Sequence, residues 1–554
     1  MKFAEYSGLN LPEVADNILR FWKEDQIFAK SVSSRKGAER YVFYEGPPSA
    51  NGLPGIHHVM ARTIKDIFPR YKTMKGFQVK RKAGWDTHGL PVELGVEKEL
   101  GITKEDIGTK ISIEEYNAAC KKAVMRYTDV WGSMTEKVGY WVDMDDPYIT
   151  YKAKYMESVW WLLKQIYDKG LIYKGYTIQP YSPKAGTGLS SHELNQPGTY
   201  QDVTDTTVVA QFKTVKNTLP EPLKGIEGDI YFLAWTTTPW TLPSNTALSV
   251  GPKITYAVVK TFNQYTFEPI HVLLAKSLVG KQFDGKFQEA ESDADLTNFK
   301  KEDKLIPYKV ISEIKGKDLV GIRYAQLLDY TLPYQNPENA FRVISGDFVT
   351  TEEGTGIVHT APTFGADDMQ VAQKADPPVP PMLVLDEQGN PVPLVDLQGR
   401  FRPEMGELAG KYVKNEYYDD GKATERSVDV QIAIRLKQEN KAFRVEKYVH
   451  SYPNCWRTDK PILYYPLDSW FIRITAVKDR MFSLNQTINW KPKTTGDGRF
   501  GNWLANANDW NLSRSRFWGT PLPIWRTEDG KEEIIIGSIA QLKEEMLRAK
   551  DAGV

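Results

Sequence analysis

Cysteine is almost absent from this sequence. Only Cys120 and Cys455 occur in 554 residues. Two thiols exclude the disulfide framework of a small secreted protein and favour a reducing compartment. The opening stretch MKFAEYSGLNLPEV lacks the basic and then apolar pattern of a leader, and no apolar run is long enough to cross a bilayer. We therefore expect a cytoplasmic protein with no membrane partner.

An excess of charge of either sign is also missing. Lys and Arg number 71, and Asp and Glu number 71. This balance argues against sequence-blind, charge-driven binding of nucleic acid, although a local basic face could still hold a structured RNA. The G-x-G-x-x-G fingerprint of dinucleotide-binding enzymes does not follow the first predicted strand, which argues against a nucleotide-dependent oxidoreductase.

The N-terminal third alternates between two kinds of pattern. We predict a short buried strand at 41–48, a helix after the following turn, a strand at 77–86, and a helix leading into another strand over 157–175. Pro69 is expected to kink or end the first of these helices. Strands that alternate with helices predict a parallel sheet of the α/β class.

The composition changes at about residue 199, where threonine-rich and β-branched runs begin. They predict a β-rich insertion over 199–444, and the proline-dense stretch 376–385 is expected to be a surface loop within it. The α/β pattern resumes at 445–554 and continues that of 1–198. Before the first strand, 11–31 has the apolar spacing of one amphipathic helix.

Two adjacent histidines follow a Gly/Pro turn in the stretch 51-NGLPGIHHVMAR-62. A strand, a turn and a helix N-terminus present backbone N–H groups and the helix dipole to phosphate. Imidazole donors there can stabilise the charge that develops as a nucleotide is attacked. For an isolated pair, His57 and His58 would be interpreted more simply as surface or helix-capping residues. The sequences on both sides favour the functional interpretation.

These flanking segments, 44-YEGPPSANGLP-54 and 84-GWDTHGLPVELGVEK-98, closely resemble class I aminoacyl-tRNA synthetases, and among them the isoleucine enzymes. The resemblance continues in the expected order through 235-WTTTPWTLPSN-245, 354-GTGIVHTAPTFGADD-368 and 512-LSRSRFWGTPLPIW-525. It implies a Rossmann-type catalytic domain interrupted by a β-rich editing insertion. The implied substrates are isoleucine, ATP with Mg²⁺, and tRNA(Ile), and we expect a monomer.

The resemblance also implies an amino-acid site. Asp86 would hold the α-ammonium group of the substrate through a charge-assisted hydrogen bond. Pro47, Trp470 and Trp518 would form the walls of the pocket for the aliphatic side chain. Tryptophan side chains are found more often in a core than in a pocket, so a structural role for both tryptophans stays open.

The ATP-binding signature departs from the family order. The family has His-x-Gly-His, whereas this chain has Gly55, Ile56, His57 and His58. The first and third positions have exchanged residues, so His57 adds bulk where a small residue lets the nucleotide lie close to the helix. We assign Gly55, His57 and His58 to ATP and the two histidines to catalysis. Two interpretations stay open: a damaged enzyme, or a variant in which His57 has taken over the missing role. The intact flanks favour the variant.

The β-rich insertion resembles the editing domain of the family. Discrimination of valine from isoleucine by one methylene, the standard example of this limit, is worth only about 1–3 kcal/mol, so a second, hydrolytic site is needed. The three threonines would contact the terminal ribose and the ester, and the asparagine would support their loop. The histidine would exclude the larger side chain, and the aspartate would bind the ammonium group. These editing residues are Thr236, Thr237, Thr238, Asn245, His359 and Asp368.

Three elements of the family do not occur in this sequence. The stretch 181-YSPKAGTGLSSHE-193 has no cysteine and 452-YPNCWRTD-459 has only Cys455, so we expect no structural zinc. Neither the Lys-Met-Ser-Lys-Ser loop nor an anticodon-binding helical domain occurs before the polar helix expected at 541–554. We expect the N-terminal portion of a longer synthetase. The alternatives are a stand-alone deacylase of misacylated tRNA and a non-catalytic tRNA-binding relative.

Overall fold

The computed structural model describes residues 8–419 and 421–553. The chain forms two compact units, here called unit 1 and unit 2. Unit 1 comprises Met1–Tyr173, Ile472–Trp510 and Arg516–Val554, and unit 2 comprises Lys174–Phe471 and Asn511–Ser515. Within the described residues, no helix is both long enough and apolar enough to span a membrane.

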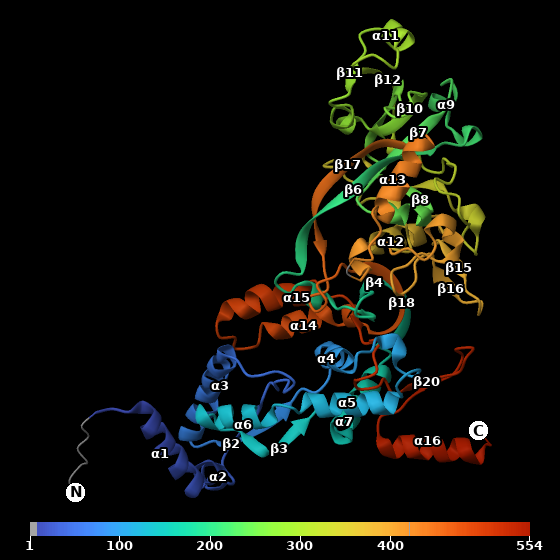
Figure 1. Ribbon diagram of the computed structural model, residues 1–554. Coiled ribbons are helices and arrows are strands. Elements are labelled where there is room, and N and C mark those ends of the chain that lie inside the picture. The colour runs from blue at the N-terminus through green and yellow to red at the C-terminus, as the bar shows by residue number, and fades with distance from the viewer. Residues whose placement is uncertain (1–7, 420, 554) are drawn as a thin grey trace. The chain divides into compact units, whose positions relative to one another are not determined.

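Unit 1 is built on a parallel sheet with the order β1-β2-β3, of which β2 and β3 are labelled in Figure 1. The three strands are β1 (Arg40–Tyr44), β2 (Gln78–Trp85) and β3 (Asp143–Ile149). Parallel strands joined through helices confirm the predicted α/β class. The prediction that β1 is buried was wrong. Val42 and Tyr44 are 62% and 60% exposed, because β1 pairs only with β2 in the described part of the chain and is an edge strand.

Helix α3 (Ile56–Met74) connects β1 to β2. Pro69 lies inside α3 and does not end it, because the helix continues for five more residues. The loss of one backbone donor at Pro69 is tolerated there, and the Thr73 hydroxyl donates to the Pro69 carbonyl at 2.8 Å. Most of the apolar stripe of α3 is exposed, with Ile56 at 82% and Met60 at 63%. The buried side of the helix is instead partly polar.

The other helices of unit 1 lie before, between and after these strands in the chain. The single helix predicted over 11–31 is two helices, because Gln26 has a left-handed backbone conformation (φ 50°) that separates them. The helices are α1 (Leu11–Glu24), α2 (Ile27–Ser33), α4 (Leu90–Leu100), α5 (Ile113–Val124), α6 (Thr128–Lys137), α7 (Ala153–Tyr167), α14 (Lys478–Asn485), α15 (Gly501–Ala505) and α16 (Ile539–Asp551). A hairpin of β20 (Ile524–Arg526) and β21 (Glu533–Ile535) precedes α16.

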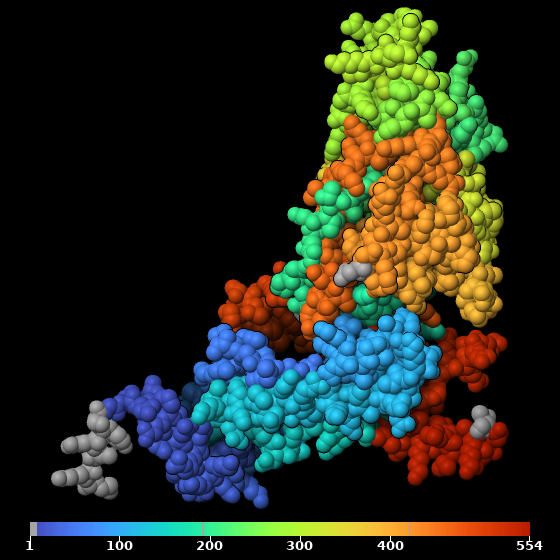
Figure 2. All heavy atoms as spheres, viewed as in Figure 1, coloured from blue at the N-terminus to red at the C-terminus, as the bar shows by residue number. Residues whose placement is uncertain are grey.

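Unit 2 contains a large mixed sheet, as predicted for the β-rich insertion. Its strands run in the order β11-β12-β9-β10-β7-β14-β8-β13, and β6 pairs with both β7 and β17. The bounds are β6 (Tyr200–Lys213), β7 (Ile230–Thr236), β8 (Ala247–Val250), β9 (Thr255–Phe262), β10 (Pro269–Ala275), β11 (Phe287–Glu289), β12 (Ile306–Lys315), β13 (Arg342–Ser345), β14 (Ile357–Thr360) and β17 (Ala442–Pro453). Strands β6 and β17 form a long antiparallel ribbon, seen as adjacent green and orange segments in Figure 2.

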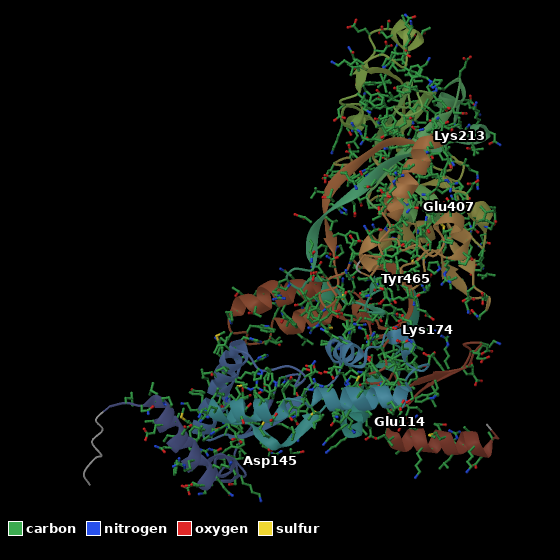
Figure 3. The ribbon with its side chains drawn as sticks, in the orientation of Figure 1. Glu114, Asp145, Lys174, Lys213, Glu407 and Tyr465 are labelled. Carbon is green, nitrogen blue, oxygen red and sulfur yellow. The ribbon has the colours of Figure 1, made fainter. Side chains whose placement is uncertain are left out.

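A second sheet has the order β19-β18-β4-β5. Its strands are β4 (Ile172–Ser182), β5 (Thr187–Gly188), β18 (Leu463–Ile472) and β19 (Trp510–Asn511). Tyr465 of β18, labelled in Figure 3, donates its hydroxyl to the Val395 carbonyl at 2.8 Å. The short helices are α8 (Ser191–Leu194), α9 (Glu221–Lys224), α10 (Val279–Gln282), α11 (Asp293–Asn298), α12 (Ala366–Lys374) and α13 (Val428–Gln438).

The proline-dense stretch 376–385 is not the surface loop that its composition predicted. Val379 and Met382 are 3% and 0% exposed, and the stretch ends in β15 (Leu383–Leu385), which pairs with β16 (Pro391–Pro393). The prolines interrupt regular structure, but the apolar side chains between them are anchored in the core of unit 2. The core therefore includes this segment together with the large sheet.

Candidate functional site

The carboxyl ends of β1 and β2 bring two of the predicted amino-acid residues together. Beyond the strands, Ser49 and Asp86 form a parallel bridge, and the Asp86 N–H donates to the Pro48 carbonyl at 3.0 Å. Pro47 and Asp86 therefore follow neighbouring strands, at the sheet edge where open α/β sheets bind ligands. Pro47 is half-buried and the side chain of Asp86 is exposed, so its carboxylate is accessible.

Trp518 lies beside the same end of β2. Its ring N–H donates to the Thr87 carbonyl, and its ring is 5.4 Å from that of His88 in an edge-on contact. Burial lowers the pKa of His88, and the charge of Asp86 acts against this shift. Pro47, Asp86 and Trp518 thus gather at one place in unit 1.

Trp470 belongs to unit 2. There its backbone N–H donates to the Ser513 hydroxyl at 2.8 Å, and its carbonyl accepts from the Leu512 N–H, also at 2.8 Å. The backbone of Trp470 is therefore fixed by the chain around β19. Its assignment to the isoleucine pocket stays a prediction.

A buried ion-pair cluster holds Trp518 against α4, and sequence reasoning did not identify it. The Arg516 guanidinium contacts Glu93 at 3.0 Å and also contacts Glu97, and the Arg516 and Glu93 side chains are 6% and 1% exposed. Glu93 also accepts the Trp518 N–H at 3.0 Å. The stretch RSRFWGT contains the arginine, but its two carboxylate partners lie more than 400 residues earlier and no spacing pattern links them.

The exchanged signature lies at the N-terminus of α3. Gly55 is the N-cap, and its N–H donates to Nδ1 of His58 at 2.9 Å. The His57 and His58 rings are 3.8 Å apart, and His58 also packs edge-on against Trp131 at 4.7 Å. His58 therefore caps the helix, as the simpler interpretation required, and at the same time lies where the first-turn N–H groups can meet an anion.

The hydrogen bond to Gly55 decides which nitrogen of His58 carries the proton. Burial lowers the pKa of His58, and the neighbouring His57 and Arg62 lower it further. The ring is therefore neutral at pH 7, and because Nδ1 accepts from the backbone, the proton lies on Nε2. His58 is a preset donor at Nε2, and His57 beside it is exposed.

Four of the predicted editing residues of unit 2, Thr236, Thr238, Asn245 and His359, belong to one hydrogen-bonded network. The Thr238 N–H donates to the Thr236 hydroxyl at 3.1 Å. His359 is 2.9 Å from Asn245 through Nδ1 and 3.0 Å from Thr241 through Nε2. Burial lowers the pKa of His359 to about 4, so this ring is neutral at physiological pH. The threonines end β7 and begin the 3₁₀ turn η3 (Pro239–Ser244), whereas His359 comes from β14.

Asp368 follows His359 in the sequence, after the turn that joins β14 to α12. It is in the first turn of α12, and its Oδ2 accepts the Ala361 N–H at 2.8 Å. The other oxygen, Oδ1, has no hydrogen-bond partner in the part of the chain that the structure describes. Burial raises the pKa of Asp368 to about 6, and the hydrogen bond from Ala361 limits the rise. This carboxylate is suited to an ammonium group, which would favour its charged form.

Two members of the network, Thr241 and Tyr324, were not predicted. The Tyr324 hydroxyl donates to Asn245 Oδ1 at 2.7 Å, and the Thr241 hydroxyl donates to the Thr238 carbonyl at 2.8 Å. Thr241 is the last threonine of WTTTPWT, so its distance of three residues from Thr238 in a turn was the available signal. Tyr324 gave no signal. Thr237 is half-buried, and within the described residues its side chain makes no hydrogen bond to the network.

No group of three or more His, Cys, Asp or Glu side chains is arranged for a metal ion among residues 8–419 and 421–553. Cys455 is fully buried, and its backbone N–H donates to the Lys460 carbonyl at 2.8 Å within a tight turn. The expectation of no structural zinc stays a prediction.

A family model described as "tRNA synthetases class I (I, L, M and V)" matches residues 17–553. The chain belongs to this family. Among curated synthetases it is 61% identical over 569 residues to the isoleucine–tRNA ligase of Bacteroides fragilis, covering 100% of this chain and 49% of that protein. The Cytophaga hutchinsonii isoleucine–tRNA ligase is 61% identical over 565 residues, again covering 100% and 49%.

A more distant synthetase, the isoleucine–tRNA ligase of Clostridium novyi, is 42% identical over 547 residues, covering 99% of this chain and 46% of the relative. The chain thus spans about half the length of the curated relatives it matches. The match over nearly the whole chain establishes the class I family. The names that state an activity and a substrate are those of the longer relatives.

Proposed function

We propose that this chain provides the amino-acid-activation and editing sites of an isoleucine–tRNA ligase. The observation that carries the proposal is the identity of 61% over the whole chain to proteins named isoleucine–tRNA ligase. In this proposal 1–198 and 445–554 belong to the catalytic domain, and 199–444 is the editing insertion. The cytoplasmic location and the monomeric state expected from the sequence remain parts of the proposal.

Unit 1 is proposed to form isoleucyl-adenylate from isoleucine and ATP. Asp86 would bind the α-ammonium group, beside Pro47 and Trp518 at the ends of β1 and β2. The phosphates of ATP, with Mg²⁺, would face the N-terminus of α3, where Nε2 of His58 and the first-turn N–H groups are donors. Such donors stabilise the charge that develops at the α-phosphate when the carboxylate of isoleucine attacks.

Unit 2 is proposed to hydrolyse valyl-tRNA(Ile). Asp368 would bind the ammonium group of the misattached amino acid through its unpaired oxygen. The hydroxyls of the three threonines would contact the terminal ribose and the ester, and His359 would limit the size of the pocket. Because the pocket accepts valine and excludes isoleucine, it adds a second selection to the weak first one.

The test is isoleucine-dependent exchange between ATP and pyrophosphate, together with deacylation of valyl-tRNA(Ile), in a synthetase of the relatives' length that carries these residues. The proposal predicts exchange with isoleucine and faster hydrolysis of valyl-tRNA(Ile) than of isoleucyl-tRNA(Ile). Hydrolysis without any exchange would favour the stand-alone deacylase, which the connected network of unit 2 also supports. Binding of tRNA with neither reaction would favour the non-catalytic relative.

A further inference from the structure

Tyr324 begins a chain of hydrogen bonds at the centre of the proposed editing site. Its side chain is 2% exposed, and its hydroxyl donates to Asn245 Oδ1 at 2.7 Å. The backbone of Tyr324 is held as well, because its N–H donates to the Phe341 carbonyl at 3.0 Å. Tyr324 is therefore held both at its backbone and at its hydroxyl group in the core of unit 2.

The Asn245 amide has one orientation that satisfies its neighbours. Nδ2 is 2.8 Å from the Ala247 carbonyl and 2.9 Å from Nδ1 of His359, and Oδ1 accepts from Tyr324. A flipped amide would direct Oδ1 at the Ala247 carbonyl, which has no proton to donate. Because Asn245 is buried, water does not compensate for such a lost hydrogen bond.

This orientation fixes the proton on His359. Nδ2 of Asn245 is a donor, so Nδ1 of His359 accepts and the ring proton lies on Nε2. Nε2–H then donates to the Thr241 hydroxyl at 3.0 Å, and that hydroxyl donates to the Thr238 carbonyl at 2.8 Å. The donors all run in one direction from Tyr324 to Thr238, because the chain ends at a carbonyl that can only accept.

We propose that Tyr324 is a positioning residue of the editing site, which acts through Asn245 to hold His359 in the Nε2–H tautomer and in one orientation. His359 then serves as a fixed wall against isoleucine, with both of its ring nitrogens hydrogen-bonded inside the network. The low pKa of about 4 that burial gives His359 agrees with a ring that stays neutral. The effect on selection between valine and isoleucine rests on the proposed editing function. The orientation and tautomer of His359 follow from the hydrogen bonds alone.

The tautomer is measured by nitrogen NMR on the purified 554-residue chain with ¹⁵N-labelled histidine at pH 7, with the His359 signals assigned by loss in His359→Asn. We expect an unprotonated Nδ1 and a protonated Nε2. Asn245→Asp, which cannot donate to Nδ1, should transfer the proton to Nδ1. A proton on Nδ1 in the parent chain would overturn the inference without any variant.

The role of Tyr324 is tested with Tyr324→Phe against Tyr256→Phe. Tyr256 is an equally buried tyrosine of unit 2, whose hydroxyl donates to the Gly356 carbonyl at 2.8 Å and accepts the Gly251 N–H at 2.9 Å, two partners outside the network. The probes are 2′-amino-2′-deoxyadenosines acylated with valine or isoleucine, and the readout is the ratio of their dissociation constants. Tyr324→Phe should reduce the preference for valine about three- to tenfold, as expected for one lost hydrogen bond. It should also produce a fraction of His359 with Nδ1 protonated.

Tyr256→Phe should leave both readouts unchanged within twofold. Parent-like behaviour of Tyr324→Phe, or an equal change in Tyr256→Phe, would contradict a positioning role. If the parent chain bound neither probe, the proposed editing function would fail, and the tautomer measurement would still decide the inference. If the parent preferred valine while Tyr324→Phe changed nothing, the editing function would stand and the inference would fall.

Discussion

At the residue scale, the position of the His57 ring limits which residues fit at position 55. A Cβ atom at position 55 would lie 2.9 Å from Cε1 and 3.0 Å from Nδ1 of His57. Real Cβ atoms do not approach ring atoms this closely, so a side chain fits at position 55 only when the His57 ring moves or is removed. We therefore predict that the exchange of the first and third signature residues is a coupled change.

The coupling predicts non-additive kinetics of adenylate formation. Gly55→His alone should slow isoleucine-dependent exchange more than the double variant Gly55→His with His57→Gly, which restores the family order and should stay active. His57→Ala should slow exchange, and His58→Ala should slow it more. A donor aimed at transition-state charge is worth about 2.7–4 kcal/mol, or roughly 10²–10³ in kcat.

The measurement includes inhibition by a non-hydrolysable isoleucyl-adenylate analogue. The bulk of His57 predicts weaker inhibition of the parent than of the double variant, with a smaller change in the KM for ATP. Equal inhibition of the two proteins, or additive effects of the single changes, would mean that His57 points away from the nucleotide.

Asp368 gives a prediction for the pH dependence of editing. Burial raises its pKa from 3.8 to about 6, so the ligand-free carboxyl loses its proton only as the pH passes 6. Binding of an ammonium group needs the charged form, and kcat/KM for valyl-tRNA(Ile) should therefore rise roughly tenfold per pH unit below 6 and level off above it. Asp368→Ala should abolish hydrolysis and leave isoleucine activation intact. The matched control is Asp367→Ala, at the exposed neighbouring position.

The same shift affects stability in the opposite sense. The folded state holds a proton on Asp368 that the unfolded chain releases near pH 3.8. The contribution of this group is therefore fully present below that pH and is lost as the pH rises through about 6. Replacement by asparagine should remove this part of the pH dependence of the unfolding free energy.

Hydrolysis of valyl-tRNA(Ile) at a rate that does not change between pH 5 and 7 would contradict the proposed role of Asp368 in binding the ammonium group.

At the element scale, Arg516 connects the segment around Trp518 to α4. Its partners Glu93 and Glu97 are buried carboxylates, so removal of the arginine leaves charge without compensation in the core. Arg516→Leu should reduce the unfolding free energy by about 3–5 kcal/mol. The comparison is Arg126→Ala, which breaks a solvent-exposed pair with Glu99 and should reduce the unfolding free energy much less than Arg516→Leu does. Equal effects in urea unfolding would contradict the structural role of Arg516.

Local pattern predicted the elements better than their surroundings. The spacing of apolar residues and the positions of turn residues located β1, α3, β2 and the β-rich insertion, because these signals are local. They did not predict that β1 and the apolar stripe of α3 are exposed, since burial depends on which elements pack there. The left-handed Gln26 between α1 and α2 also escaped prediction, because a helix-forming residue at that point gives no sign of a break.

Prediction of the sites had the same limit. Motifs singled out Thr236, Asn245, His359 and Asp368 because these residues lie in short, recognisable stretches, and their editing roles stay predictions. Tyr324 comes from a separate segment and meets Asn245 only in the folded sheet. Hydrogen-bond partners that are distant in sequence are selected by tertiary packing, which a single sequence does not encode in any local period.

At the scale of the whole molecule, Asp86 and His58 belong to unit 1, whereas the proposed editing network belongs to unit 2. The sequence lacks the lysine loop that completes the ATP site in the family, so the 554-residue chain alone should not form isoleucyl-adenylate at a useful rate. Unit 2 contains its complete network, and the same preparation should retain some hydrolysis of valyl-tRNA(Ile). Robust exchange by the chain alone would show that the missing loop is dispensable here.

The central claim is that the site at the ends of β1 and β2 activates isoleucine, and Asp86→Ala tests it most directly. The measurement is isoleucine-dependent ATP–pyrophosphate exchange in a synthetase of the relatives' length that carries this chain. Loss of a hydrogen bond to a charged group, about 1.5–3 kcal/mol, predicts a KM for isoleucine raised roughly 10- to 100-fold. The control Asp145→Ala, at an exposed position of β3 labelled in Figure 3, should leave the KM unchanged. Exchange by Asp86→Ala with the parent's KM for isoleucine would contradict the account.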